Sequence, residues 1–224
     1  MYPFEESYQI FIMGHMRSRS SLFAHILMTD KKIFGIGESN KVYRKKMDIL
    51  KMRIKTQLYG DRILPLGFMY LDQINHNKKT PNLHLIKSVS RIVILVRKPE
   101  ETFESIKELS KNFYKEWSHE EIESYYIERL EFLKELKLSN MKSNLIVVDS
   151  EDLVTDTQKC LERVQSFLQL ENALSSNYKL HSFTGKHGDP SKNISSGRIV
   201  RTEGKLYGKH IAKKCNDLYN SILT

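Results

Sequence analysis

The sequence predicts an α/β fold with a mainly parallel central sheet, formed by a single domain over residues 1–224. Three observations predict it. Short apolar runs alternate with amphipathic helical segments, which is the order that a parallel sheet covered by helices requires. Residues 92–96 are apolar at every position, as in a strand that is buried on both faces. A chain of 224 residues, 40% hydrophobic and 28% charged, has the size and composition of one soluble domain.

The first elements are a strand, a turn and a helix. Residues 8–13 are rich in β-branched and aromatic side chains and end at Gly14, which predicts a strand. Residues 20–28 carry apolar side chains at helical spacing, which predicts a helix. Residues 14–21 therefore form a strand-to-helix turn. The short segment 33–38 contains two glycines and is predicted to be a loop or an edge strand.

The next segments are less regular. Residues 43–58 place apolar side chains on one helical face and basic side chains largely elsewhere, which predicts an amphipathic helix. Pro65 and Gly67 interrupt the pattern, and a short helix is expected at residues 68–74.

Two strand-like runs follow, at residues 83–86 and 92–96. Too few residues separate them for a helical crossover, so they form either a hairpin or one bent element. Pro99 then opens a long helix, and Glu100 and Glu101 make its first turn acidic, as the helix dipole favours.

The second half continues the alternation of helices and strands. Further helices are predicted at residues 119–138, 157–168 and 207–223, and a buried strand at residues 145–148. Residues 179–205 are rich in Gly, Ser and Lys, which indicates a long functional loop.

Composition narrows the class of partner. The formal charge of +9 suits anionic ligands, but the chain has no recognised nucleic-acid motif. The two cysteines are far apart and lack CxxC spacing, so neither a disulfide framework nor a metal site is expected. No apolar run approaches the roughly 20 residues that span a bilayer. The N-terminal residues lack the basic and apolar regions of a secretory signal, so a cytoplasmic protein is expected.

The turn at residues 14–21 is a candidate anion site. Unpaired backbone N–H groups and the dipole of the following helix both point at such a turn. Three serines (Ser18, Ser20 and Ser21) add hydroxyl donors, and Arg17 and Arg19 add charged fork-like donors that suit phosphate.

The pattern differs from the nucleotide-triphosphatase loop, G-x-x-x-x-G-K-[ST]. Gly14 and Ser21 fit that pattern, but Arg19 stands in place of the second glycine and Ser20 in place of the lysine. Since that lysine reaches the outer phosphates, ATP or GTP hydrolysis is disfavoured.

The turn resembles the 5′-phosphosulfate loop of the sulfotransferases, commonly G-x-P-[RK]-S-G-[ST]-[ST]-L. Residues 14–22 read GHMRSRSSL, so Met16 replaces the usual proline and Arg19 the usual glycine. Three later stretches resemble the same family in the same order. They are Arg97-Lys98-Pro99 with Ser105 eight residues after Arg97, residues 145–154 followed by Phe167-Leu168, and residues 188–193 followed by Gly197-Arg198.

This resemblance implies a three-layer sandwich of the P-loop NTPase-like type, and 3′-phosphoadenosine 5′-phosphosulfate as co-substrate. It implies that the turn holds the 5′-phosphosulfate through Arg17, Ser18, Arg19, Ser20 and Ser21. Arg97 and Ser105 would bind the 3′-phosphate. Lys192, and after it Arg198, would add contacts to the same phosphate from the late loop (residues 179–205), which would close over the nucleotide.

The implied reaction is an in-line displacement on sulfur that needs no metal and no covalent intermediate. Arg17 is expected to stabilise the leaving phosphate. Glu38 resembles a G-E element that several sulfotransferases place at the acceptor, which makes it the first candidate for the general base; His84 or His15 is the alternative. Lys87 either faces the sulfonate or is an exposed lysine. The acceptor, a small molecule, a glycan or a protein, is not identified by the sequence.

Two other functions stay open at this point. One is a nucleotide kinase or NTPase with a degenerate loop, which would need an acidic magnesium ligand. The other is a non-catalytic nucleotide-binding protein on the same fold, because Met16 and Arg19 depart from the family's loop.

Overall fold

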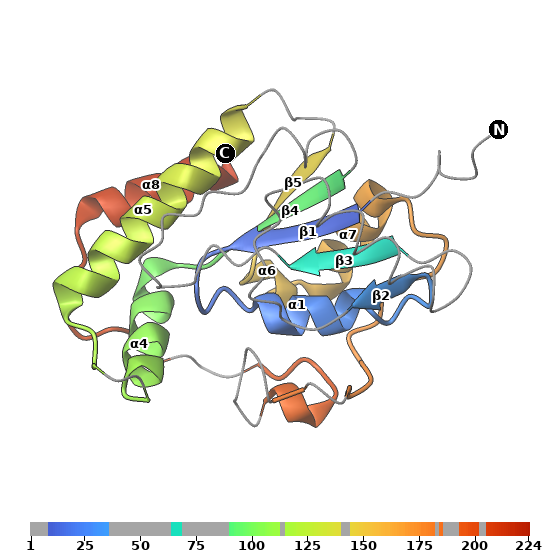
Figure 1. Ribbon diagram of the computed structural model, residues 1–224, viewed down its shortest axis with the longest axis horizontal. Coiled ribbons are helices and arrows are strands. Elements are labelled where there is room, and N and C mark those ends of the chain that lie inside the picture. Colours follow the sequence, from blue (N-terminus) through green and yellow to red (C-terminus); the bar gives the residue numbers. More distant parts are fainter. Residues whose placement is uncertain are drawn as a thin grey trace.

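A computed structural model describes residues 9–35, 64–68, 90–112, 115–139, 144–181, 184–185, 193–201 and 205–224 (Figure 1). Its strands pair in the order β2-β3-β1-β4-β5, and every pair is parallel, which confirms the predicted sheet. The strands are β1 (Gln9–Gly14), β2 (Ile33–Gly35), β3 (Leu64–Phe68), β4 (Ser90–Val96) and β5 (Leu145–Asp149).

Helices cover both faces of the sheet, so the three-layer arrangement is also confirmed. In Figure 1, α4, α5 and α8 lie on one side of the sheet, and α1, α6 and α7 lie on the other. The helices are α1 (Ser20–Leu27), α4 (Pro99–Ser110), α5 (His119–Leu138), α6 (Asp152–Thr155), α7 (Thr157–Leu168) and α8 (Lys213–Leu223), with a 3₁₀ turn, η1 (Ile194–Ser196).

Strand periodicity divides the core between the two faces. Phe11 and Ile92 pack with α4, α5 and α8, whereas Ile10 and Val93 pack with α1 and α7. All four side chains are fully buried. The central strands are therefore apolar at consecutive positions because each of their faces is covered by helices.

Local sequence explains where several helices begin. Pro99 is the first residue of α4, where its missing N–H costs no intrahelical bond. Ser118 and Glu121 form a reciprocal capping box at α5, each side chain accepting a hydrogen bond from the other's backbone N–H.

Two sequence predictions need correction. Residues 64–68 were expected to lie in an irregular stretch but form β3, an internal strand. Pro65 and Gly67 lower its β propensity, and pairing with β1 and β2 on its two sides overrides them. The last helix begins at Lys213 rather than at residue 207, because the Tyr207 N–H bonds to the Glu100 carbonyl and the Tyr207 ring packs on Phe103.

Some predictions concern segments that the structure does not describe. The amphipathic helix at residues 43–58 and the strand at residues 83–86 lie outside the described residues, as do residues 69–74 of the short helix. The long loop at 179–205 is described in part, with η1 inside it.

Candidate phosphate-binding site

The carboxyl ends of three neighbouring strands form the edge at which the candidate site lies. Gly14 at the end of β1 pairs with Leu95 of β4, and Val96 of β4 pairs with Asp149 of β5. The chain leaves this edge through the loop at residues 15–19, the start of α4 and the turn before α6 (Figure 1). Parallel α/β sheets bind their ligands at such an edge.

The loop at residues 15–19 has an unusual backbone. Arg17 and Arg19 both have φ of 65°, in the left-handed region that non-glycine residues rarely adopt. Gly14 is required for a steric reason. A Cβ atom there would lie 2.6 Å from Ser18 Oγ and 2.7 Å from the Leu95 carbonyl oxygen.

His15 braces this loop against β4. Its Nδ1–H donates to the Met16 carbonyl oxygen (2.9 Å), and its Nε2 accepts from the Arg97 backbone N–H (3.0 Å). Burial lowers the pKa of His15 to about 4, so the ring is neutral at neutral pH. Because both ring nitrogens are bonded to backbone, His15 holds the loop in place and has no nitrogen left to accept a substrate proton.

Two tyrosines of α5 form hydrogen bonds to the same region. The Tyr125 hydroxyl accepts from the Met16 N–H (2.7 Å), and the Tyr126 hydroxyl donates to the Arg97 carbonyl oxygen (2.7 Å). Both bonds join residues far apart in the sequence, so α5 positions the loop and the start of α4 together.

Arg17, Arg97 and Ser105 come together in one hydrogen-bond network. Arg17 Nε donates to Ser105 Oγ (2.8 Å), and Arg97 Nη1 donates to the Arg17 carbonyl oxygen (3.2 Å). The sequence predicted that Arg97 and Ser105 would share a phosphate. In the structure Ser105 bonds to Arg17, which links the cation of the loop to α4.

Arg19 turns away from its loop and bridges two other elements. Its Nη1 donates to the Ser150 carbonyl oxygen (2.6 Å) and to Glu151 Oε2 (3.3 Å), and its Nη2 donates to Glu101 Oε2 (3.3 Å). Arg19, which replaces the expected glycine, therefore connects the loop to α4 and to the turn before α6.

Glu101 was not singled out as a site residue from the sequence. Its Oε2 accepts from Arg97 Nε (3.0 Å) and Nη2 (2.6 Å) as well as from Arg19. Burial raises the pKa of Glu101, but the hydrogen bond from Arg97 and the charges of Arg97, Arg19 and Lys98 outweigh burial and lower it overall. The signal in the sequence was the i,i+4 spacing of Arg97 and Glu101 on a helix start.

Ser18 and the uncapped start of α1 are candidate donors for an anion. Ser18 is fully buried, and its hydroxyl has no hydrogen-bond partner among the described residues. Ser20 and Ser21 open α1, whose N-terminus has no side-chain cap. An anion at this position would accept a hydrogen bond from the Ser18 hydroxyl and face the N–H groups at the start of α1.

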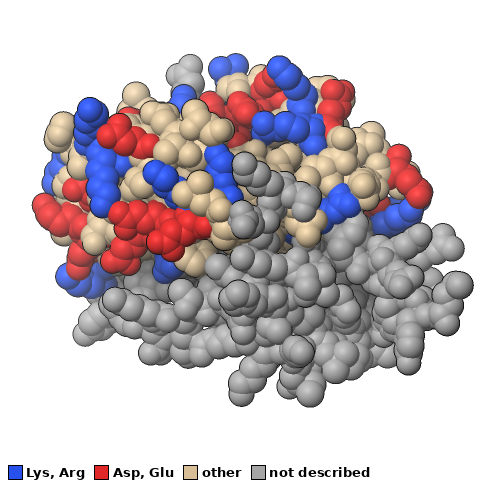
Figure 2. Space-filling model, turned by 90° about the horizontal axis from the view of Figure 1, so that it is seen from above, with Lys and Arg blue, Asp and Glu red and all other residues tan. Residues whose placement is uncertain are grey.

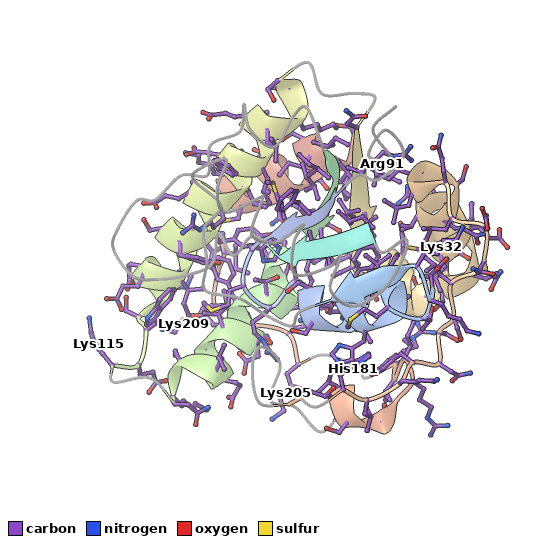
Figure 3. All side chains as sticks on the ribbon, turned by 45° about the vertical axis from the view of Figure 1, so that its right-hand side comes forward. Lys32, Arg91, Lys115, His181, Lys205 and Lys209 are labelled. Atoms are coloured by element: carbon purple, nitrogen blue, oxygen red, sulfur yellow. The ribbon has the colours of Figure 1, made fainter. Side chains whose placement is uncertain are left out.

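The late loop is fixed to α1 by a short hydrogen-bonded chain. The His181 N–H donates to Thr184 Oγ1 (2.9 Å), and Thr184 Oγ1 lies 2.8 Å from His25 Nε2. Because His25 Nδ1 donates to the Ser21 carbonyl oxygen (2.8 Å), Nε2 is the acceptor for the threonine hydroxyl. Figure 3 shows His181 beside α1.

Arg198 is positioned through its backbone. It forms an antiparallel bridge with Asn177, and its carbonyl oxygen accepts from the Tyr178 hydroxyl (3.2 Å). Arg198 is exposed.

The remaining predicted site residues, Glu38, His84, Lys87 and Lys192, lie outside the described residues. Within the described part of the chain, no group of three or more His, Cys, Asp or Glu side chains could hold a metal ion. No described helix has the length and apolar character to cross a membrane. On the face seen in Figure 2, basic and acidic side chains are interspersed over the described surface.

Three solved structures with the same fold are sulfotransferases or sulfotransferase domains. The sulfotransferase domain of the Synechococcus PCC 7002 olefin synthase is 16% identical with a TM-score of 0.67, and the match covers 100% of this chain and 98% of that domain. The sulfotransferase domain of the curacin biosynthetic pathway is 14% identical with a TM-score of 0.61, over 97% of this chain and 98% of that one.

A third structure, mouse sulfotransferase SULT7A1 complexed with PAP, is 13% identical with a TM-score of 0.53, over 74% of this chain and 59% of that one. No protein-family model matches the chain, and no curated protein matches it. Topology, layers and these three neighbours agree that the chain has the sulfotransferase fold.

Proposed function

We propose that the protein is a sulfotransferase that moves a sulfonate group from 3′-phosphoadenosine 5′-phosphosulfate to a hydroxyl or amine. One observation carries the proposal: Arg17, Arg97 and Ser105, from two separate segments, meet in one hydrogen-bond network beside the uncapped start of α1. The structure of SULT7A1 complexed with PAP, which has the same fold, supports a nucleotide ligand.

The roles of the donor-binding residues follow from their places at the edge of the sheet. The start of α1, with Ser18, Ser20 and Ser21, offers N–H and hydroxyl donors to the 5′-phosphosulfate. Arg97 and Ser105 are assigned to the 3′-phosphate. Lys192, and after it Arg198, are assigned to the same phosphate from the late loop, which closes over the nucleotide.

In the transfer step, the acceptor oxygen or nitrogen forms a bond to sulfur. The bond between sulfur and the bridging phosphate oxygen breaks, and its electron pair leaves with the adenosine bisphosphate. Arg17 stabilises the charge that develops on that phosphate with its guanidinium fork. The acceptor's proton passes to a general base, for which Glu38 is the first candidate and His84 the second.

A kinase or NTPase fits the same loop less well. Ser20 stands where such enzymes carry the lysine that reaches the outer phosphates.

The test is sulfonate transfer from ³⁵S-labelled donor to a panel of phenols, alcohols, sugars and amines, read together with release of the bisphosphate. The wild type is expected to show acceptor-dependent release. Glu38→Ala is expected to bind the bisphosphate normally and to lose turnover by at least ~100-fold, as removal of a general base does. Bisphosphate binding without transfer to any acceptor would favour a non-catalytic nucleotide-binding protein.

If Glu38→Ala turns over at the wild-type rate, Glu38 is not the base, and His84→Ala becomes the informative variant. His15 is not tested as the base, because both of its ring nitrogens are bonded to backbone.

A further inference from the structure

Glu101 holds two arginines of the candidate site with a single carboxylate oxygen. Its Oε2 accepts three N–H groups, two from Arg97 (3.0 and 2.6 Å) and one from Arg19 (3.3 Å). Arg97 leaves the end of β4, Arg19 belongs to the loop after β1, and Glu101 lies in the first turn of α4. The Glu101 carboxylate therefore connects the loop after β1, which supplies Arg19, to the end of β4, which supplies Arg97.

Partial burial makes these ion pairs stronger than exposed ones. The side chains of Arg97, Glu101 and Arg19 are 12%, 13% and 15% exposed. Water screens such charges less than it screens surface pairs. The attraction between Glu101 and the arginines is therefore larger than at the surface, and so is the repulsion between the arginines.

The arginines also repel one another. The pKa of Arg97 is lowered by burial first and then by the charge of Arg19, with a smaller contribution from Arg17. Glu101 opposes this effect through its hydrogen bond and its charge. The lowered pKa of Glu101 keeps it ionised at neutral pH. In the absence of an anionic ligand, Glu101 is therefore a negative charge that allows the guanidinium groups to gather.

Glu101 also occupies the edge of Arg97 that suits a phosphate. The Nε and Nη2 atoms form the fork that binds two oxygens of one anion, and both point to Glu101. The opposite edge includes Nη1, which donates to the Arg17 carbonyl oxygen. A phosphate on Arg97 must displace Glu101 or bind beside it against its charge.

We propose that Glu101 is the internal counter-ion of the arginine cradle, defined as Arg17, Arg19 and Arg97, and that it limits how tightly the cradle holds a phosphate. The proposal rests on the proposed function in one respect, because it takes Arg97 to be a phosphate ligand. It makes Glu101 a specificity-determining residue: a ligand gains full affinity only if it carries a phosphate that can replace the carboxylate at Arg97.

The experiment compares Glu101→Gln with the wild type by calorimetry. The ligands are 3′,5′-adenosine bisphosphate, adenosine 5′-monophosphate and inorganic phosphate. Because removing one nearby negative charge favours an anion, the bisphosphate is expected to bind at least about fivefold more tightly to the variant. Adenosine 5′-monophosphate, which lacks the 3′-phosphate, is expected to gain less than about twofold. Without ligand, the variant is expected to melt at a lower temperature than the wild type.

Two variants serve as controls. Glu104→Gln removes the same charge from the same helix. The charge of Glu104 contributes to the raised pKa values of Tyr207 and Lys111, which lie outside the arginine cradle. The bisphosphate affinity of Glu104→Gln should therefore stay within about twofold of wild type. Glu101→Asp keeps the charge and should also stay close to wild type. Melting curves establish that each variant is folded before its affinity is compared.

The outcomes separate this proposal from the proposed function. If the bisphosphate binds the wild type and Glu101→Gln does not tighten it, the counter-ion role is wrong and the donor site stands. If neither protein binds the bisphosphate but Glu101→Gln binds inorganic phosphate more tightly, the donor assignment is wrong and the counter-ion role stands. No gain with either ligand overturns the counter-ion role.

Discussion

At the scale of single residues, the loop at 15–19 stores strain that its contacts hold in place. Left-handed backbone at a non-glycine residue costs about 1 kcal/mol or more, and Arg17 and Arg19 both adopt it. The side chain of Arg17 is bonded to Ser105, and that of Arg19 to Ser150 and Glu101. The loop is therefore fixed before a ligand arrives, which reduces the ordering cost of binding.

Substitution of Gly14 tests the packing of this loop directly. In Gly14→Ala the new methyl group would meet Ser18 Oγ at 2.6 Å and the Leu95 carbonyl oxygen at 2.7 Å, and the latter is backbone that cannot rotate away. We expect a loss of about 1–3 kcal/mol in the free energy of unfolding, measured by urea titration, and a weaker affinity for the bisphosphate.

Gly208→Ala is the matched control, because a Cβ atom at Gly208 has no heavy atom within 4 Å. Equal stability of the two variants would show that the loop after β1 packs differently.

The lowered pKa of His15 predicts that the free energy of unfolding depends on pH. In the unfolded chain His15 takes up its proton near pH 6.5, and in the folded chain only near pH 4. Between these values the unfolded state binds more protons, so the stability that His15 provides is complete above pH 6.5 and is lost as the pH falls toward 4. The loss amounts to about 3 kcal/mol.

His15→Gln removes this titration and keeps an acceptor for the Arg97 N–H. We expect the variant to be less stable than wild type at pH 8, with the difference in unfolding free energy shrinking by about 2–3 kcal/mol at pH 4.5. Urea titrations at the two pH values measure it, and a constant difference would contradict the neutral, buried state of His15.

At the scale of elements, the late loop depends on α1 and α4 for its position. His25 of α1 bonds to Thr184, and Tyr207 binds α4 through the Glu100 carbonyl oxygen (3.1 Å). Lys192 and Arg198 lie in sequence between these two anchors. The two anchors therefore lie on either side of the residues that are assigned to the nucleotide.

Thr184→Val tests the first anchor. It removes the hydroxyl that joins His181 to His25 while keeping the shape of the side chain. We expect a loss of about 1 kcal/mol in stability and a bisphosphate affinity several-fold weaker, measured by calorimetry. Thr224→Val, at the exposed C-terminus, should change neither. An unchanged affinity in Thr184→Val would mean that the late loop does not depend on this anchor for binding.

The sequence predicted elements well wherever one local signal dominated. The apolar run of β4 identified that strand, and α5 and α7 have the predicted bounds. The strand β3 was missed because Pro65 and Gly67 are poor strand formers, and its pairing partners are distant in sequence.

The same distinction holds within the candidate site. Arg17 and Arg97 could be expected to meet, because adjacent parallel strands end at one edge of the sheet. The direction of the Arg19 side chain and the role of Glu101 could not, because both depend on contacts between three segments whose relative placement only the folded chain defines.

At the scale of the whole molecule, the candidate site is supported by both helix layers. The α5 tyrosines that bond to Met16 and Arg97 belong to one helix layer, and α1 and α6 belong to the other. A ligand at this edge contacts elements from both layers and binds only when they are assembled. We expect the bisphosphate to raise the melting temperature, with a stabilisation of about 2.7 kcal/mol at one hundred times its dissociation constant.

The central claim is that this edge of the sheet binds a nucleotide with a phosphate on the ribose. Calorimetry with 3′,5′-adenosine bisphosphate and, separately, with ATP and Mg²⁺ tests it most directly. We expect one micromolar site for the bisphosphate, much weaker binding of ATP, and a loss of bisphosphate affinity of at least about tenfold in Arg97→Ala. Micromolar binding of ATP with no binding of the bisphosphate would contradict it.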